Sequence, residues 1–188
     1  MTLHDNGCHL VHCACVDVGL RSQREVATPA LATAKLTEPH VDVDAWGHPG
    51  LPHLRLDFTA IDPTAEDYAS SHQIPAGAAA RAERAKATKY GTPLGGVGVT
   101  GLSLELSGRF GPNLDALLRR LSGYRRALQV AAGRDPGRPL QSWRLAFSLA
   151  LARFTAASVF SATDTVPLGL AGARRACRAP QTSGHLSQ

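Results

Sequence analysis

The 188-residue chain has few aromatic residues, one methionine and only three lysines. Phe, Trp and Tyr together make up 5% of the chain, although apolar residues as a class make up 44%. A globular core is therefore possible, but small residues must form much of it, which leaves its packing weakly specified. Seventeen arginines stand against the three lysines. This bias fits a GC-rich coding sequence as well as any chemistry, so no function follows from it.

The sequence also lacks a disulfide framework and a long apolar run. Its four cysteines are Cys8, Cys13, Cys15 and Cys177, and three of them fall within eight residues, unlike the spacing in a disulfide-stabilised domain. The longest apolar stretch, residues 145–160, is interrupted by an arginine and by polar residues, so we expect no membrane span. No basic segment followed by an apolar one opens the chain, so we expect no secretory signal.

Charge is distributed unevenly along the chain. Residues 1–108 contain 8 Lys and Arg against 12 Asp and Glu, whereas residues 109–188 contain 12 Arg and 3 Asp. An acidic half that can bind metal beside a basic half that can bind phosphate is typical of a nucleic-acid enzyme. A solvated basic tail would give the same pattern, and charge alone does not separate the two interpretations.

Periodicity predicts an α/β fold, with a small mixed β-sheet flanked by helices. The alternation of HVDVDAW (40–46) and LRLDFTAI (54–61) predicts two half-buried strands, and the Ala-rich, charged segment 76–90 predicts a helix. We expect further elements in this order: a helix over 3–20, an unstructured passage ending at residue 39, a Gly-weakened strand within 93–106, and helices over 111–132 and 140–160. One domain over 1–162 and a disordered basic tail over 163–188 follow.

Asp42 and Asp57 are the candidate metal ligands. They lie on two predicted strands joined by a short Gly/Pro turn, so a hairpin would bring their carboxylates onto neighbouring strands. On the same face, they could share Mg²⁺ or Mn²⁺, which would activate a bound water and stabilise charge on a phosphate. A nearby lysine would orient that water or offset the developing charge. Two Asp on adjacent strands are also what a solvent-facing strand edge shows.

Short segments around this pair resemble, in their order, the endonuclease region after the reverse transcriptase of site-specific non-LTR (LINE-like) retrotransposons. That region belongs to the restriction-like PD-(D/E)XK nucleases. The first four segments are LHDN (3–6), PHVDV (39–43), LRLDFTAIDPT (54–64) and ERAKATKYG (83–91). The likeness continues through residues 92–112 and 143–154, so it covers about 150 residues and includes the acidic pair.

The resemblance implies a restriction-endonuclease-like fold and a magnesium-dependent hydrolase that nicks DNA. It assigns the metal ligands to Asp42 and Asp57 and the catalytic lysine to Lys86 or Lys89, with Tyr90 beside them. It makes DNA the partner, together with a reverse transcriptase domain encoded upstream. Such a nuclease is consistent with a nuclear location, but no basic import cluster in the sequence is convincing.

The chain departs from the family pattern at several positions. The lysine usual two residues after the second acid is Thr59, the step before Asp42 contains no proline, and five glycines between residues 95 and 108 weaken the next strand. These departures imply a fragment or a decayed copy. One alternative is therefore a catalytically inactive remnant that binds nucleic acid through its Arg-rich C-terminal half, and another is a fragment without a stable fold.

Two further groups of residues could carry function. The basic helix 111–132 contains the candidate DNA-backbone contacts Arg119, Arg120, Arg125 and Arg126, with solvated helix surface as the alternative. The first helix contains the possible zinc ligands His4, Cys8, His9, His12, Cys13 and Cys15.

His4 and Cys8 could be the last two ligands of the Cys-Cys-His-Cys knuckle that precedes the resembled nuclease, but its first two cysteines are absent here. Cys8, His12 and Cys15 would share one helix face, which is also how small buried residues are placed. We therefore expect helix packing, and not zinc, to explain this cluster.

Overall fold

The structure is a computed structural model that describes residues 2–28, 40–68, 70–71, 73–90 and 98–164. The predicted passage up to residue 39 and most of the predicted basic tail lie outside these residues. The chain forms two compact units, Met1–Phe154 and Thr155–Gln188. The first unit contains the sheet and every residue discussed below.

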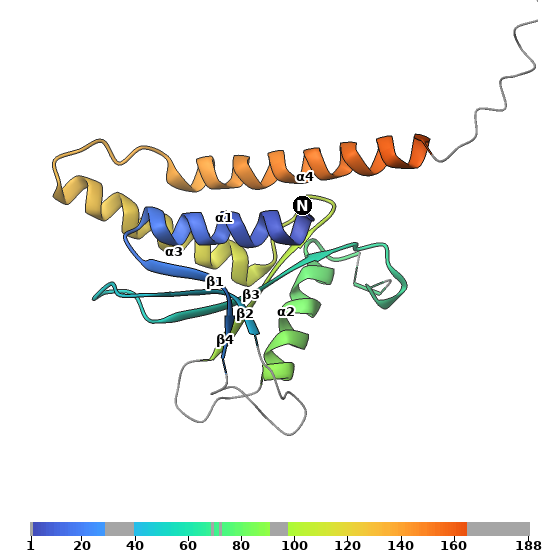
Figure 1. Cartoon of the computed structure of the whole chain (residues 1–188), viewed down its shortest axis with the longest axis horizontal. Coiled ribbons are helices and arrows are strands. Elements are labelled where there is room, and N and C mark those ends of the chain that lie inside the picture. Colours follow the sequence, from blue (N-terminus) through green and yellow to red (C-terminus); the bar gives the residue numbers. More distant parts are fainter. Residues whose placement is uncertain (1, 29–39, 69, 72, 91–97, 165–188) are drawn as a thin grey trace, which may run out of the picture. The chain divides into compact units, whose positions relative to one another are not determined.

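The first unit is mixed α/β, with a four-stranded mixed sheet flanked by helices, as predicted (Figure 1). Its elements, in chain order, are α1 (Leu3–Asp17), β1 (Arg21–Ala27), β2 (His40–Trp46), β3 (Leu54–Ile61), the 3₁₀ helix η2 (Glu66–Tyr68), α2 (Gly77–Tyr90), β4 (Val99–Glu105), α3 (Pro112–Ala131) and the start of α4 (Pro139–Asp164). The sheet order is β1-β2-β3-β4. The strand β2 is antiparallel to both β1 and β3, and β4 runs parallel to β3. Parallel neighbours need a crossover, which α2 supplies.

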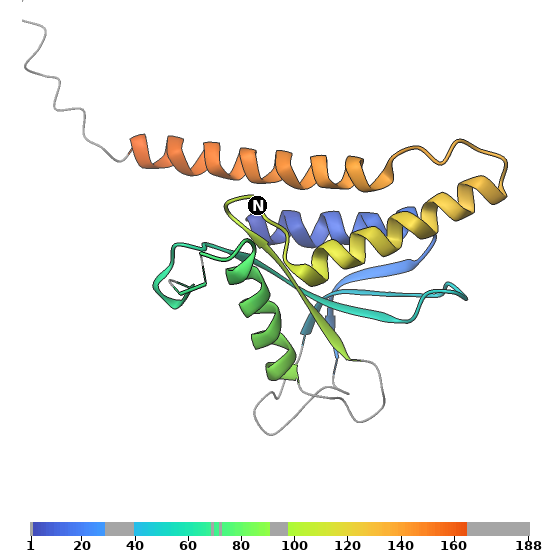
Figure 2. The same ribbon diagram turned by 180° about the vertical axis from the view of Figure 1, so that it is seen from behind.

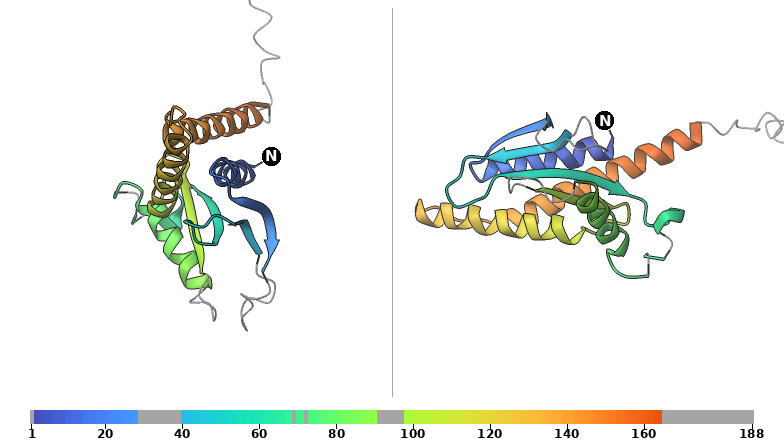
Figure 3. Two further views of the ribbon diagram at one scale, coloured as in Figure 1. Left: turned by 90° about the vertical axis from the view of Figure 1, so that its left-hand side faces the viewer. Right: turned by 90° about the horizontal axis from the view of Figure 1, so that it is seen from below.

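The predicted order of elements is wrong at one point, because it lacks β1. This strand alternates between exposed and half-buried side chains and contains no fully buried residue. It is an edge strand, held through backbone pairing with β2 from Arg21 opposite Trp46 to Ala27 opposite His40 (Figure 3). A strand that buries little apolar surface leaves little hydrophobic periodicity to detect.

The two faces of the sheet pack against different helices. On β4, Leu102 and Leu104 belong to the main core, whereas Ser103 and Glu105 bond to α2 on the other face. Figures 1 and 2 show α1 and α3 on the first face and α2 on the second. The largest fully buried apolar residues of the main core come from β3, β4, α1, α3 and α4, or lie next to them: Val11, Val18, Leu56, Phe58, Leu102, Leu104, Leu114, Leu118, Leu121 and Phe147.

Local signals in the sequence explain where α1 begins and ends. Thr2 and Asp5 form a capping box, in which each side chain accepts a hydrogen bond from the backbone N–H of the other. Gly19 has a φ of +83°, the left-handed conformation that commonly follows a helix end. The Cα of Gly7 lies against the Phe58 ring, which any side chain at this position would overlap. The small residue therefore sets how closely α1 approaches β3.

Two buried glutamates fasten the starts of α2 and α3 to the sheet. Glu105 accepts a hydrogen bond from the backbone N–H of Ala79 (3.2 Å), in the first turn of α2. Glu83 accepts from the backbone N–H of Asn113 (2.9 Å), in the first turn of α3, and from the Ser103 hydroxyl (3.0 Å). Carboxylates are stabilised at helix N-termini by the unpaired N–H groups and the helix dipole. The position of α2 on the sheet is thus fixed by polar contacts at buried positions.

The beginning of α4 packs on the first unit through Trp143 and Phe147, whose rings contact α1 and β3 residues. Leu145 and Leu149 of the same helix are exposed. Within the described part of the chain, no helix has both the length and the apolar character needed to cross a membrane.

Candidate active site

Strands β2 and β3 separate where the two candidate metal ligands lie. Their backbone pairing runs from Ala45 opposite Leu54 to Val43 opposite Leu56, and continuing this register places Asp42 opposite Asp57. At that position the backbone N–H of Phe58 donates to Asp42 Oδ2 at 2.6 Å. A side-chain carboxylate therefore replaces the backbone partner where strand pairing stops, and the two predicted acids interact with each other there.

The pairing of β1 with β2 is interrupted at the same level of the sheet. Glu25, which the register would place opposite Asp42, has a φ of +56° and makes no ladder pair. This left-handed conformation is uncommon for a residue other than glycine, and such positions cluster at functional sites. Asp42 thus lies in a local irregularity that involves both neighbouring strands.

Asp57 is buried and is held by two side chains of α2. Lys86 Nζ forms an ion pair with Asp57 Oδ1, and the Tyr90 hydroxyl donates to Asp57 Oδ2 at 2.6 Å. Burial acts to raise the pKa of Asp57, but the hydrogen bonds from Lys86 and Tyr90 outweigh it and lower that pKa below its ordinary value. Burial and the bond to Asp57 raise the pKa of Tyr90, so the phenol stays protonated and acts as a donor.

Asp42 shows the opposite shift. Burial raises its pKa, the Phe58 N–H opposes the rise, and the neighbouring negative charge of Asp57 adds to it. Two carboxylates whose environments push their pKa values apart are characteristic of catalytic sites. Their hard oxygen atoms also fit Mg²⁺ or Mn²⁺, because a divalent cation would remove the repulsion between them.

The two predicted lysines differ in what they reach. Lys86 contacts Asp57 directly, whereas Lys89 Nζ lies 3.3 Å from the Tyr90 hydroxyl and 4.8 Å from the centre of its ring. Asp57 pairs with Gly101 of β4, where an added Cβ would lie 2.8 Å from the Cβ of Lys86. The absence of a side chain at Gly101 therefore lets the Lys86 stem pass close to the sheet.

Sequence reasoning missed one neighbour of the acidic pair, His4. Its Nε2 lies 3.2 Å from Asp42 Oδ2, and Cys8 Sγ lies 3.7 Å from the same nitrogen. The LHDN segment placed His4 at the start of the first helix, but nothing in it indicated contact with β2. That contact depends on how α1 packs across the sheet.

The remaining histidines and cysteines of α1 serve other contacts. His12 Nδ1 is hydrogen-bonded to the Ser22 hydroxyl of β1 at 2.9 Å, and Cys13 Sγ lies 3.5 Å from His9 Nε2. Cys8 and Cys15 are buried in the main core. These three cysteines of α1 are all free thiols.

The four candidate arginines of α3 do not form one uniform surface. Arg119 bonds to Asp115 at 2.7 Å, and Arg125 bonds to Asp17 at 3.0 Å while stacking over the Trp143 ring. Within the described part of the chain, neither Arg120 nor Arg126 belongs to an ion pair. At about 100° per residue, Arg120 and Arg125 also lie on different sides of the helix.

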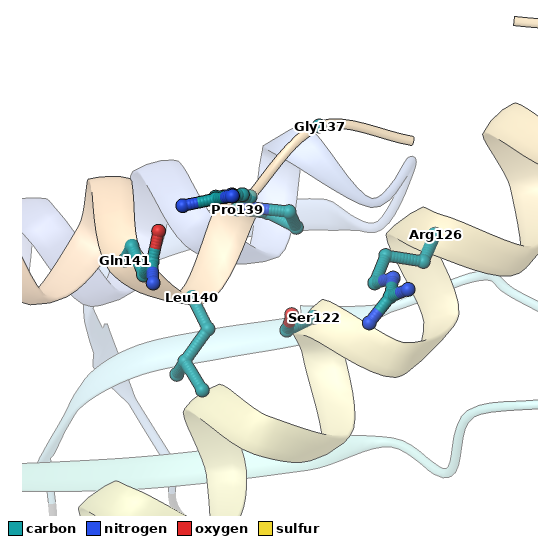
Figure 4. Close-up of a pocket in the computed structure, with 7 residues that line it drawn as sticks. Ser122, Arg126, Gly137, Pro139, Leu140 and Gln141 are labelled. Atoms are coloured by element: carbon teal, nitrogen blue, oxygen red, sulfur yellow. The ribbon is translucent and has the colours of Figure 1, made fainter. Parts of the chain in front are cut away.

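A cavity of about 380 Å³ lies elsewhere, between α3 and the start of α4 (Figure 4). It is lined by Ser122, Arg126, Gly137, Arg138, Pro139, Leu140 and Gln141. This lining contains no carboxylate, thiol or imidazole, so the cavity offers no metal ligand of these types.

No protein-family model and no curated protein matches the chain. A function must therefore be inferred from the geometry and chemistry of the site.

Proposed function

We propose that the chain is a metal-dependent DNA endonuclease domain with a restriction-endonuclease-like fold, derived from a non-LTR retrotransposon. One observation carries this proposal. Asp42 from β2, Asp57 from β3 and Lys86 from α2 meet at the gap between two strands. Two acids and a lysine are the groups that metal-assisted cleavage of a phosphodiester requires.

The segments that resemble the retroelement nucleases also converge at this place. They lie far apart in the sequence, yet His4 of the first segment, Asp42 of the second, Asp57 of the third and Lys86 of the fourth form a continuous chain of contacts. An accidental likeness between short segments would not be expected to gather its polar residues around one point. This convergence supports the proposed ancestry as well as the site.

The residues present fit a hard divalent cation. Asp42 and Asp57 would hold Mg²⁺ or Mn²⁺, which when bound supplies an activated water and stabilises charge on the phosphate. Asp42 is oriented by the Phe58 N–H, and Asp57 is oriented by the Tyr90 hydroxyl. These fixed donors hold both carboxylates in place before any substrate arrives.

Lys86 takes the place of the lysine that Thr59 replaces. It comes from α2 to the face of β3 on which Asp57 lies, and its Nζ is within 3.4 Å of the Phe58 carbonyl oxygen. The ammonium group is thus positioned to orient the attacking water or to offset charge on the phosphate. Lys89 acts one step further away, through Tyr90.

A supercoiled-plasmid nicking assay tests this proposal. Wild type and Asp57→Ala are compared in Mg²⁺, in Mn²⁺ and in EDTA, with Asp44→Ala as the matched control, because Asp44 also lies on β2 but pairs with His53. We expect metal-dependent nicking by wild type and by Asp44→Ala, and none by Asp57→Ala. Equal nicking by wild type and Asp57→Ala would point to a contaminating nuclease and overturn the site.

The alternative, an inactive remnant that binds nucleic acid, is favoured by one observation. Lys86 and Tyr90 already satisfy both oxygens of Asp57, so the charge of Asp57 is balanced without a metal. Binding would then depend on Arg120 and Arg126, since Arg119 and Arg125 are paired with acids. Salt-dependent DNA binding by a folded wild type that never nicks, weakened by Arg120→Ala and Arg126→Ala, would establish this alternative.

A further inference from the structure

His4 and Cys8 of α1 and Asp42 of β2 form a compact group of three different ligand types. One ligand atom from each, an imidazole nitrogen, a thiol sulfur and a carboxylate oxygen, lies within 4.8 Å of the other two. We infer that these residues form a second metal site, which takes Zn²⁺ or a similar soft divalent cation such as Co²⁺. This site goes beyond the proposed nuclease and does not require that the chain cut DNA.

The separations between the ligand atoms fit a tetrahedral zinc ion. Zinc bond lengths of about 2.0–2.1 Å to nitrogen, 2.0–2.2 Å to oxygen and 2.3 Å to sulfur give tetrahedral edges of about 3.4 Å for N···O and about 3.6 Å for S···N. The observed distances are 3.2 Å from His4 Nε2 to Asp42 Oδ2 and 3.7 Å from Cys8 Sγ to His4 Nε2. Two of the three edges are therefore already in place before an ion binds.

The chemistry of the three groups also suits zinc better than magnesium. A thiolate and an imidazole are ligands that zinc prefers, whereas magnesium selects oxygen. A Cys8 thiolate and the Asp42 carboxylate together would balance the two charges of the ion. The His4 side chain is 45% exposed, so an ion could reach the group from solvent, and water would complete the coordination of a three-ligand site. Three protein ligands with one open position is the pattern of catalytic zinc sites.

Asp42 would link this site to the carboxylate pair. Its side chain has two oxygen atoms with about four lone-pair positions, enough to contact one ion beside Asp57 and another beside His4. The sequence around the first helix offers His4 and Cys8 but no complete ligand set. The third ligand comes from β2, thirty-four residues after Cys8, and only the packing of α1 across the sheet reveals it.

The same helix provides a matched comparison. His9 and Cys13 repeat the spacing of His4 and Cys8, with Cys13 Sγ 3.5 Å from His9 Nε2. Within the described part of the chain, no third ligand completes that pair. Metal binding should therefore depend on Cys8 and not on Cys13, because only the His4–Cys8 pair has a third ligand nearby. Both cysteines have a histidine four residues earlier.

Cobalt titration of the full chain tests the inference, because a thiolate bound to Co²⁺ gives an intense near-ultraviolet absorption that a purely oxygen-ligated ion lacks. We expect wild type and Cys13→Ser to develop this absorption with one equivalent of Co²⁺, and excess Zn²⁺ to remove it. Cys8→Ser should lose it. His4→Gln should weaken cobalt binding by more than about tenfold, the loss caused by removing even a supporting partner of a metal ligand.

The outcomes separate this site from the proposed nuclease. Asp57→Asn should keep the thiolate absorption even though nicking is lost, so either proposal can fail alone. No thiolate absorption in folded wild type, or absorption that survives in Cys8→Ser and disappears in Cys13→Ser, would overturn the inference. If Cys8→Ser does not fold, His4→Gln decides, because its side chain is half-exposed, and unchanged cobalt affinity in that variant would also overturn it.

Discussion

Two pairs of buried or half-buried carboxylates, Glu83 with Glu105 and Asp42 with Asp57, have different surroundings. Glu83 and Glu105 each accept backbone N–H bonds from the first turn of a helix, and no second acid contributes to the shift in the pKa of Glu83. Asp42 and Asp57 instead face each other, and each shifts the pKa of the other. The first arrangement is complete as it stands, whereas the second places two like charges together.

This difference shows why burial alone does not identify a functional acid. Burial raises the pKa of Glu83 as it does that of Asp42. The Glu83 oxygens, however, accept hydrogen bonds from fixed donors and so hold α3 in place. The acidic pair needs an additional cation, which Lys86 provides in this structure and a metal ion would provide in an active enzyme. A neighbouring group of the same charge therefore indicates a functional acid better than burial does.

The largest effect should distinguish the two lysines near the acidic pair. Lys86→Met should reduce metal-dependent nicking about a thousandfold, the scale of losing one group that stabilises transition-state charge. Lys89→Met should stay within about threefold of wild type, because Lys89 reaches Asp57 only through Tyr90. The measurement is the initial nicking rate under single-turnover conditions. Equal losses in both variants would contradict the assignment of Lys86.

The next effect concerns the structural group. Glu83→Ala should lower the free energy of unfolding by about 3 kcal/mol, because it leaves two backbone N–H groups in the first turn of α3 without their acceptor. Glu83→Gln keeps an acceptor oxygen and should cost about 1 kcal/mol, the value of the charge at a helix start. Urea denaturation followed by circular dichroism measures both. A Glu83→Ala variant as stable as wild type would show that this carboxylate is not structural.

The two members of the acidic pair should respond oppositely to loss of charge in the absence of metal. Asp57→Asn removes the partner of Lys86 and should lower the free energy of unfolding at neutral pH by about 2 kcal/mol, as expected for a charged hydrogen bond. Asp42→Asn keeps an acceptor for the Phe58 N–H but removes the repulsion, and should raise stability by about 1 kcal/mol. Changes of the same sign in both variants would contradict the geometry of the pair.

The smallest effect is the pH dependence of that pair. The raised pKa of Asp42 means that its ionisation destabilises the folded state, so wild type should lose stability relative to Asp42→Asn as pH rises from the ordinary Asp range through the raised value. The lowered pKa of Asp57 stabilises the folded state above the ordinary range, and this stabilisation should disappear as pH falls through the lowered value. Urea denaturation of wild type and the two variants at a series of pH values between about 3 and 7 measures both effects, and parallel curves of stability against pH would show that neither shift exists.

Most of the fold could be predicted because its elements bury regular apolar patterns. Val41 and Val43 alternate with acids on β2, and Leu56 and Phe58 alternate with polar residues on β3. The strand β1 could not be predicted, because its side chains are exposed or half-buried and its backbone bonds to β2 are what hold it. Hydrogen bonding between strands leaves no pattern in a single sequence when burial does not accompany it.

The two acids of the candidate site could be predicted from the sequence, but the lysine and the histidine that contact them could not. The short turn between β2 and β3 was enough to place Asp42 near Asp57. The sequence could not distinguish Lys86 from Lys89 as the partner of Asp57. The two lysines differ by about 60° around the helix, and the close contact of α2 with Gly101 helps to set the rotation of that helix. His4 was missed for a similar reason, because its contact with Asp42 depends on where α1 crosses the sheet.

The hydrogen bond from the Phe58 N–H to Asp42 gives this protein an internal reporter. That amide proton exchanges with solvent only when the bond opens, so its exchange rate measures how strongly the carboxylate holds it. Protonation of Asp42, or a ligand that binds the same carboxylate oxygen, would weaken this hydrogen bond. Exchange would then become faster at this one amide while the rest of β3 stays protected. The exchange rate of the Phe58 amide therefore reports protonation or ligand binding at Asp42, and NMR can follow it without substrate or turnover.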